Sequence, residues 1–297
     1  MIEIPRILCA VDFSDISRHA LEHALTIARW YDSQLTALYV VPTDMGIPPR
    51  MLFDDLEPAT GGERHALASN HLEAFLIDVD RGDVRVDAVV EHGDPARTIL
   101  RHATGEEFDL LVLGTHGRSG FEHLVLGSVA ERVLRKAKCP VLTVPPKAHS
   151  DATLPYRRLL CAVDFSDSSL DALRLAFSIA EESDAELTLL NVIDFPPDDA
   201  LLFGRAEALE FRSRLQTETM GRLEALIGGD ERMWCRPRAR TAIGKPYRCI
   251  VAIASEERAD LIVMGVRGRN PADLAVFGST TNHVVRSAPC PVLTSRR

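Results

Sequence analysis

Hydrophobic and polar positions follow two alternating patterns along the chain. Short apolar runs, such as 7–11 and 110–113, are typical of strands buried on both faces of a sheet. Longer segments between them carry apolar residues at helical spacing, as at Leu21, Leu25 and Ala28, which predicts amphipathic helices packed on that sheet. The predicted strands are 7–11, 34–41, 84–91, 110–113, 141–144, 159–163, 186–193, 236–243, 261–264 and 292–294, and the predicted helices include 63–79, 129–138 and 205–227.

The second half of the chain repeats the first. The heptapeptide Cys-Ala-Val-Asp-Phe-Ser-Asp at 9–15 recurs unchanged at 161–167, which indicates an internal duplication. Each copy alternates strand and helix five times, a pattern typical of the α/β class with a five-stranded parallel sheet and helices on both faces. We therefore expect two tandem domains, 1–146 and 155–297, joined by a linker at 147–154.

Length and charge agree with this division and exclude some classes of function. A chain of 297 residues suits two domains of ordinary size. Its net charge of -9 argues against a general nucleic-acid or anionic-membrane surface. No apolar run reaches the length of a membrane span, and the first residues lack the layout of a signal peptide, so we expect a cytoplasmic protein. Six cysteines without a CxxC pair predict reduced, buried thiols.

Two glycine-rich stretches carry the candidate chemistry. Gly114 and Gly265 each follow an apolar run, and in both copies a second glycine comes after two residues, a third after nine more, and then a serine. Glycines let the backbone approach a ligand closely, and the helix that starts there presents free N–H groups that suit phosphate. The alternative is a plain strand–loop–helix junction without a ligand. The same glycine spacing in both copies favours a shared ligand geometry, although a recent duplication would also explain it. We expect Ser128 to be an N-cap, with Glu131 completing a capping box.

Taken together, these motifs resemble the universal stress protein family. The resemblance rests on Ala-Val-Asp-Phe-Ser in both copies, on Tyr39-Val40-Val41 and Asn191-Val192-Ile193 at the second strands, and on the two glycine motifs. It covers almost the whole chain as two tandem copies. It implies Rossmann-like domains, of the adenine nucleotide alpha hydrolase type, with strand order 3-2-1-4-5. In the nucleotide-binding branch ATP lies across the strand ends, so the resemblance implies ATP as the ligand and leaves open whether Mg²⁺ accompanies it.

The resemblance also implies which residues hold the nucleotide, and neither copy has lost a motif position. Arg118 and Arg269 follow the second glycine of each motif, where they either pair with phosphate oxygens or are solvated loop arginines. The other matched residues of the first copy are Ala10, Val11, Asp12, Val40, Leu113, Gly114, Gly117, Gly127, Ser128 and Val129. Those of the second copy are Ala162, Val163, Asp164, Val192, Met264, Gly265, Gly268, Gly278, Ser279 and Thr280.

The two copies differ inside the glycine motif. His116 of the first copy stands where the second copy has Arg267, and Pro271 lies in the second loop only. We expect these differences to change the phosphate contacts or the closure of the loop.

Two other sets of polar residues have more than one interpretation. Asp12 and Asp164 either coordinate Mg²⁺ through the nucleotide or hydrogen-bond the ribose or the backbone, which we favour. His19 and His23 have the i, i+4 spacing of a zinc site. Because no third ligand is evident, we expect them to lie on a solvated helix face. We predict no catalytic and no metal-binding residue.

Three classes of function compete. We favour a nucleotide-dependent regulatory protein of the stress response, in which ATP occupancy shifts a loop or a partner surface. An ATP hydrolase or nucleotidyl transferase is the enzyme alternative, but the sequence has no Walker motif and no evident base beside the phosphates, so we expect any turnover to be very slow. A scaffold whose sites hold another ligand is the third class.

The fifth strands predict how the two halves assemble. In the order 3-2-1-4-5 the strands 141–144 and 292–294 would be exposed sheet edges, which proteins pair or cover. We expect them to pair in an intramolecular pseudo-dimer, as the family resemblance also implies, and a homodimer of the whole chain is a further option. The sequence does not identify a protein partner.

Overall fold

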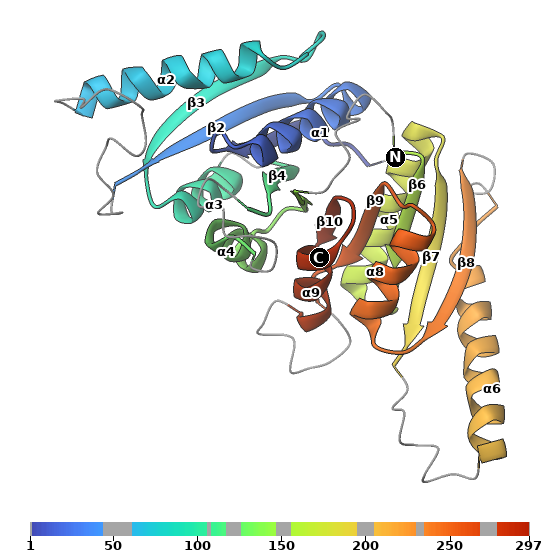
Figure 1. Ribbon diagram of the computed structural model, residues 1–297. Helices are drawn as coiled ribbons and strands as arrows, with labels where there is room; N and C mark the ends of the chain where they lie inside the picture. The colour runs from blue at the N-terminus through green and yellow to red at the C-terminus, as the bar shows by residue number, and fades with distance from the viewer. Residues whose placement is uncertain are drawn as a thin grey trace. The chain divides into compact units, whose positions relative to one another are not determined.

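The computed structural model of the chain describes residues 2–43, 61–105, 108–116, 126–146, 156–194, 205–229, 235–267 and 278–296. The chain divides into two compact units, residues 3–146 and 147–297. Strands and helices alternate in each unit, as Figure 1 shows. In the part of the chain that is described, no helix is long and apolar enough to cross a membrane.

The first unit is built on a parallel sheet whose strands lie in the order β3-β2-β1-β4-β5. This confirms the predicted order 3-2-1-4-5. The strands are β1 (Arg6–Val11), β2 (Gln34–Pro42), β3 (Val86–Gly93), β4 (Leu110–Gly114) and β5 (Val141–Val144), and the helices are α1 (Asp15–Tyr31), α2 (Gly61–Ile77), α3 (Pro95–Gly105) and α4 (Ser128–Lys136).

The second unit repeats this arrangement, with the parallel order β8-β7-β6-β9-β10. Its strands are β6 (Arg158–Ala162), β7 (Glu186–Ile193), β8 (Arg236–Ile243), β9 (Leu261–Gly265) and β10 (Val292–Ser295), and its helices are α5 (Asp167–Ser183), α6 (Arg205–Glu224), α8 (Pro246–Glu256) and α9 (Ser279–Ser287). Both units therefore belong to the predicted α/β class, as two tandem Rossmann-like domains.

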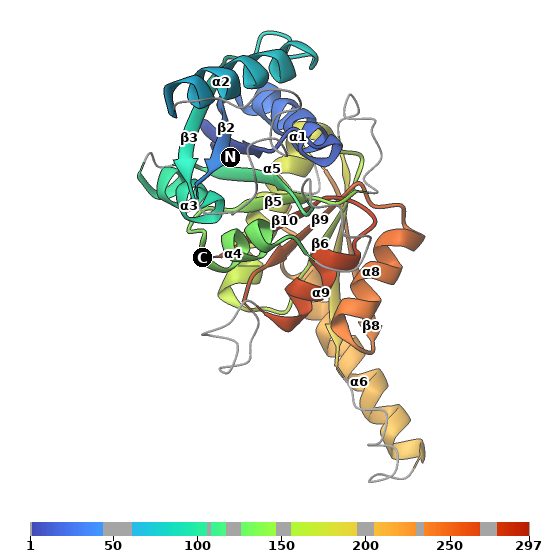
Figure 2. The ribbon, with the colours of Figure 1, turned by 60° about the vertical axis from the view of Figure 1, so that its left-hand side comes forward.

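The strand order reverses beside the first strand of each unit. The chain moves from β1 out to β2 and β3, and then returns to β4 on the other side of β1. Right-handed crossovers place α1 and α2 on one face of the sheet and α3 and α4 on the other. In the second unit, α8 and α9 accordingly pack side by side on one face (Figure 2). Ligands of such sheets bind at the carboxyl ends of the strands beside the reversal, here β1 and β4, or β6 and β9.

The apolar runs form the core of each sheet. Leu8 and Cys9 in β1 and Leu160 and Cys161 in β6 are completely buried, as expected for central strands of a parallel sheet. Burial raises the pKa of both thiols, so they stay protonated and unreactive. All six cysteines are free, as the sequence predicts, but Cys139 and Cys249 are only half-buried.

Helices α1 and α5 begin in the same way. Ser14 and Ser166 are the N-caps, and each side chain accepts a hydrogen bond from the N–H three residues later, at 3.2 and 3.3 Å. Both helices end at an aspartate in the left-handed conformation, Asp32 and Asp184. The duplication therefore preserves the local geometry around the strand end that precedes each helix.

The predicted capping box at the start of α4 is wrong. Gly127 is the N-cap, Ser128 is the first residue of the helix, and there is no side-chain capping hydrogen bond. The cause is a tertiary contact: the N–H of Gly127 donates to the carbonyl of Thr115 at 2.8 Å, which fixes the chain just before the helix. Ser128 therefore belongs to the first helical turn.

The predicted solvated face for the histidines of α1 is wrong for His23. His23 is only 8% exposed and begins a stretch of α1, from His23 to Ala28, in which every residue is buried. Burial, together with the nearby charge of His19, lowers the pKa of His23 to about 4. The matching position in α5 is Leu175, also buried.

Candidate functional site

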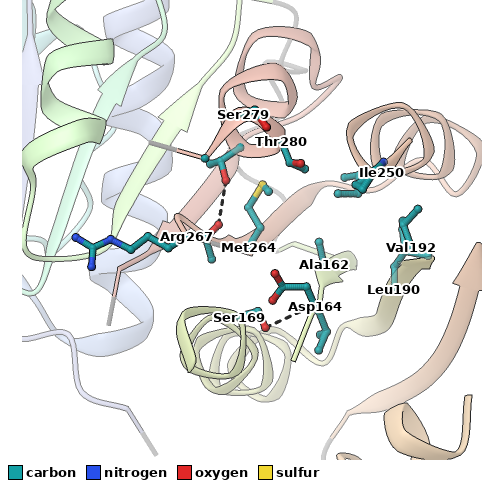
Figure 3. A pocket seen from close by; sticks show the side chains of 15 residues that line it. Ala162, Asp164, Ser169, Leu190, Val192, Ile250, Met264, Arg267, Ser279 and Thr280 are labelled. Carbon is teal, nitrogen blue, oxygen red and sulfur yellow. Dashed lines mark hydrogen bonds between the residues drawn. The ribbon is translucent and has the colours of Figure 1, made fainter. Parts of the chain in front are cut away.

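A cavity of about 130 Å³ lies in the second unit at the carboxyl ends of β6 and β9, beside the reversal of strand order (Figure 3). Gly268 and Arg269 lie outside the described residues. All the other residues that the sequence predicts for the second copy line this cavity: Ala162, Val163, Asp164, Val192, Met264, Gly265, Gly278, Ser279 and Thr280.

Six further residues line the same cavity, and the sequence motifs did not identify them as contacts. They come from the first turn of α5, from β7, from the first two turns of α8, from inside the glycine motif and from the first turn of α9. These residues are Ser169, Leu190, Pro246, Ile250, Arg267 and Thr281. Gly244, two residues before α8, has a φ of +144° that only glycine adopts readily. The glycine so close to Pro246 is the sequence signal that could have identified the turn at this side of the cavity.

A tight turn after β6 fixes the carboxylate of Asp164. One oxygen, Oδ1, accepts from the N–H of Ser166 at 3.0 Å and from its hydroxyl at 2.5 Å. The N–H of Asp164 donates to Ser169 Oγ at 3.3 Å. The turn therefore holds the Asp164 side chain at the cavity wall, where Figure 3 shows it.

The residue after this aspartate is strained in both units. Phe13 and Phe165 each have a φ of +64°, a left-handed conformation that costs a bulky residue on the order of 1–3 kcal/mol. Ring contacts hold both residues in place. The ring centres of Phe13 and Tyr39 lie 4.3 Å apart, and the Arg222 guanidinium carbon lies 3.9 Å from the centre of the Phe165 ring. Strain of this kind persists where the surroundings fix it, often at functional sites.

The end of β9 packs against the first turn of α5 with no room for a side chain at Gly265. A Cβ atom there would lie 2.5 Å from Ser168 Oγ and 2.8 Å from the Ser168 carbonyl carbon. The Ser168 hydroxyl donates to the Arg267 carbonyl at 2.5 Å, and the Thr281 hydroxyl donates to the Gly265 carbonyl at 3.0 Å. These contacts tie β9, α5 and α9 together around the cavity.

The cavity has two chemically different ends. Leu190, Val192 and Ile250 give it an apolar wall that suits a flat ring. The opposite end is the first turn of α9, where Ser279 and Thr280 line the cavity and the backbone presents N–H groups with a partial positive charge. The site is therefore suited to a ligand with an aromatic ring at one end and an anionic group at the other.

The first unit repeats the same local geometry. Asp12 Oδ1 accepts from the N–H of Ser14 at 3.1 Å and from its hydroxyl at 2.5 Å, and the N–H of Asp12 donates to Ser17 Oγ at 3.3 Å. Gly117 and Arg118 lie outside the described residues. The other predicted residues occupy the positions that match the second cavity, at the ends of β1 and β4, in β2, and at the start of α4: Ala10, Val11, Asp12, Val40, Leu113, Gly114, Gly127, Ser128 and Val129.

Among the described residues, no three His, Cys, Asp or Glu side chains come together as a candidate metal site. The charged groups of the second cavity are Asp164 and Arg267. Arg267 contributes to the cavity wall near its backbone. Figure 3 shows its side chain extending away from the cavity.

Both units contain a parallel sheet, and in each unit the same turn and a helix N-terminus lie beside the reversal of strand order. The chain is therefore a tandem Rossmann-like protein. The model of the universal stress protein family matches residues 3–145 and 155–296. The chain therefore belongs to the universal stress protein family, as a member with two tandem domains.

Individual relatives agree with this assignment. A universal stress protein of Mycobacterium tuberculosis is 27% identical over 309 aligned positions, which cover 98% of this chain and 97% of the relative. One from Methanocaldococcus jannaschii is 35% identical over 144 residues, or 47% of this chain and 81% of the relative. Among solved structures, a universal stress protein from Archaeoglobus fulgidus has a TM-score of 0.69 at 24% identity and covers 99% of this chain and 97% of its own, which shows a shared fold.

Proposed function

We propose that each unit binds one adenine nucleotide, ATP, across the ends of its first and fourth strands, and that the protein acts as a nucleotide-dependent regulator in the stress response. The observation that carries the proposal is the cavity of the second unit. It joins an apolar wall, a fixed carboxylate and a helix N-terminus within one space, which are the features that a base, a ribose and a phosphate chain require.

Each part of the nucleotide has a proposed place. The adenine lies against Val192, Leu190 and Ile250, and the ribose hydroxyls donate to Asp164. The phosphates lie at the first turn of α9. The cavity of about 130 Å³ is smaller than the roughly 300–1,000 Å³ of whole small-molecule sites, so we assign the base and ribose to it and the phosphates to its open end.

The second candidate function is slow ATP hydrolysis. Phosphoryl transfer needs an oriented nucleophile and charge clamps on the phosphates. Of the two charged groups that line the described cavity, Asp164 is engaged by Ser166 and the Arg267 side chain extends away. These observations favour a binding protein over an enzyme.

The assembly of the two halves through their fifth strands remains a prediction. Within its own unit, each fifth strand ends the strand order, with β5 beside β4 and β10 beside β9. We propose that the two units form the pseudo-dimer by pairing these strands, and that nucleotide occupancy changes a surface for a partner near this pair.

Mass spectrometry of the small molecules released from the purified, denatured chain tests the proposed ligand. We expect an adenine nucleotide, in smaller amounts per chain for Asp12→Ala and for Asp164→Ala because each variant loses one turn carboxylate. Asp171→Ala is the control, since Asp171 pairs with Arg174 on α5 and does not line the cavity. A different released ligand would favour the scaffold alternative; no released nucleotide together with no binding of added ATP would contradict the proposal.

A further inference from the structure

The surroundings of the two phosphate ends differ in charge although their backbones match. In the first unit, Asp94 precedes α3 and accepts from the N–H of Arg97 at 2.8 Å. Its other oxygen forms an ion pair with Arg132 of α4 at 2.8 Å. The backbone hydrogen bond from Arg97 and the pairing with Arg132 lower the pKa of Asp94. The Arg132 cation, one turn beyond Ser128, is therefore neutralised by a carboxylate.

The second unit replaces both members of this pair. Lys245 is the N-cap of α8 and makes no side-chain capping hydrogen bond, and His283 occupies the position of Arg132 on α9. The Nδ1 atom of His283 lies 2.7 Å from the Ser279 carbonyl, and its ring stacks on Tyr247 at 4.5 Å between centroids. Lys245 adjoins Pro246, a residue of the cavity wall. Within the described ranges, Lys245 forms no ion pair that would cancel its charge.

The second unit also has two arginines, Arg267 and Arg296, at positions that are uncharged in the first unit. The pKa of the Arg296 guanidinium is lowered by burial and by the nearby charge of Arg267. The matching positions of the first unit hold Pro145 and His116.

A fifth position carries a negative charge in the first unit only. Glu131 in the first turn of α4 corresponds to Asn282 in α9. With histidine counted as neutral, the five compared positions of the first unit carry two negative charges and one positive charge; these positions are Asp94, His116, Glu131, Arg132 and Pro145. The corresponding positions in the second unit carry three positive charges and no negative charge.

We infer that the two sites discriminate between nucleotides by charge: the second site selects a polyanionic ligand such as a nucleoside triphosphate, and the first site accepts nucleotides with fewer charges, such as a monophosphate. This rests on the proposed function, because it concerns the same two sites. The discrimination is electrostatic and acts through the field at the phosphate end, with Lys245, in place of Asp94, as the principal specificity-determining residue.

Calorimetric titration with ATP and with AMP tests this inference. Asp12→Ala isolates the second site and Asp164→Ala isolates the first. We expect the preference for ATP over AMP to be about tenfold greater in the second site at low salt. This difference between the two sites becomes smaller at high salt, because the screening length falls from about 10 Å at 0.1 M to about 3 Å at 1 M.

A charge exchange identifies the residues responsible. Lys245→Asp combined with His283→Arg installs the ion pair of the first unit in the second, and we expect it to reduce the ATP preference by about tenfold with little change in AMP binding. Aspartate is a better N-cap than lysine, so this exchange does not threaten α8, and Lys245→Gln gives a neutral intermediate. Arg214→Gln, on the exposed part of α6, lowers the net charge by one, as the double exchange does, and serves as the control.

The outcomes separate this inference from the proposed function. If both nucleotides bind and the preference for ATP over AMP is the same in the two sites, and if the charge exchange does not alter that preference, the charge discrimination is overturned while nucleotide binding stands. If neither nucleotide binds either site, the proposed function fails and the discrimination with it.

Discussion

Replacing Gly265 by alanine is expected to destabilise the second unit by about 3 kcal/mol or more, at the upper end of typical overpacking costs. A Cβ atom at this position meets backbone: it would lie 2.8 Å from the Ser168 carbonyl carbon and 2.8 Å from the Ser169 nitrogen. These atoms belong to the first turn of α5, which cannot move without disturbing the Asp164 turn.

The matching change in the first unit should cost less. At Gly114 the nearest atom to an added Cβ is Ile16 Cγ2 at 2.7 Å, and the nearest backbone atom is the His116 oxygen at 3.2 Å. This closest contact is with a side-chain methyl group and not with backbone, so a small shift of Ile16 relieves part of it, and we expect Gly114→Ala to cost about 1–2 kcal/mol. Scanning calorimetry, which separates the unfolding of two domains, measures both effects.

Gly221 provides the control for this pair. It lies in α6, and an added Cβ would meet nothing within 4 Å. Gly221→Ala should therefore leave the second unit unchanged or stabilise it by up to about 1 kcal/mol. Equal unfolding temperatures for wild type and Gly265→Ala would show that the junction between β9 and α5 is looser than the structure indicates.

Acid is expected to destabilise the first unit through His23. Burial holds the pKa of this imidazole at about 4 in the folded unit, against an ordinary value of 6.5. The folded unit keeps His23 neutral, whereas the unfolded chain takes up a proton once the pH falls below 6.5. The stability associated with neutral His23 is thus complete above pH 6.5 and is lost as the pH falls from 6.5 to 4. Because each pKa unit is worth about 1.4 kcal/mol, this loss is about 3 kcal/mol.

His23→Leu should remove this acid sensitivity. The second unit already carries leucine at the matching position, Leu175, in the same buried environment of a helix. Denaturant unfolding at pH 7, 5.5 and 4 compares the two proteins, and Glu22, whose pKa burial raises, titrates in both and cancels. If the first units of wild type and variant lose the same stability between pH 7 and pH 4, then His23 does not determine the acid response.

Much of the fold and the site could be predicted from the sequence because the chain presents each pattern twice. The repeated heptapeptide located the turns at Asp12 and Asp164, and the repeated glycine spacing located Gly265 and Gly278. In a parallel sheet these strand ends meet at one edge. The prediction that residues distant in sequence gather at that edge therefore followed from topology, and they line one cavity in the second unit.

The features that the sequence did not predict depend on tertiary contacts. Ser128 has the side chain of an N-cap, but the Thr115 carbonyl fixes Gly127 in that position instead. Leu190 and Ile250 line the cavity because their strand and helix face it, and nothing in their local sequence distinguishes them from core residues. The left-handed conformation of Phe165 opposes its intrinsic preference and requires the ring contact with Arg222.

The central claim is that each unit binds one adenine nucleotide, and calorimetric titration of the intact chain with ATP tests it most directly. We predict two sites in the wild type, one site each in Asp12→Ala and Asp164→Ala, and no saturable binding when both aspartates are replaced. Two sites persisting in both single variants, or no binding to the wild type, would contradict the account.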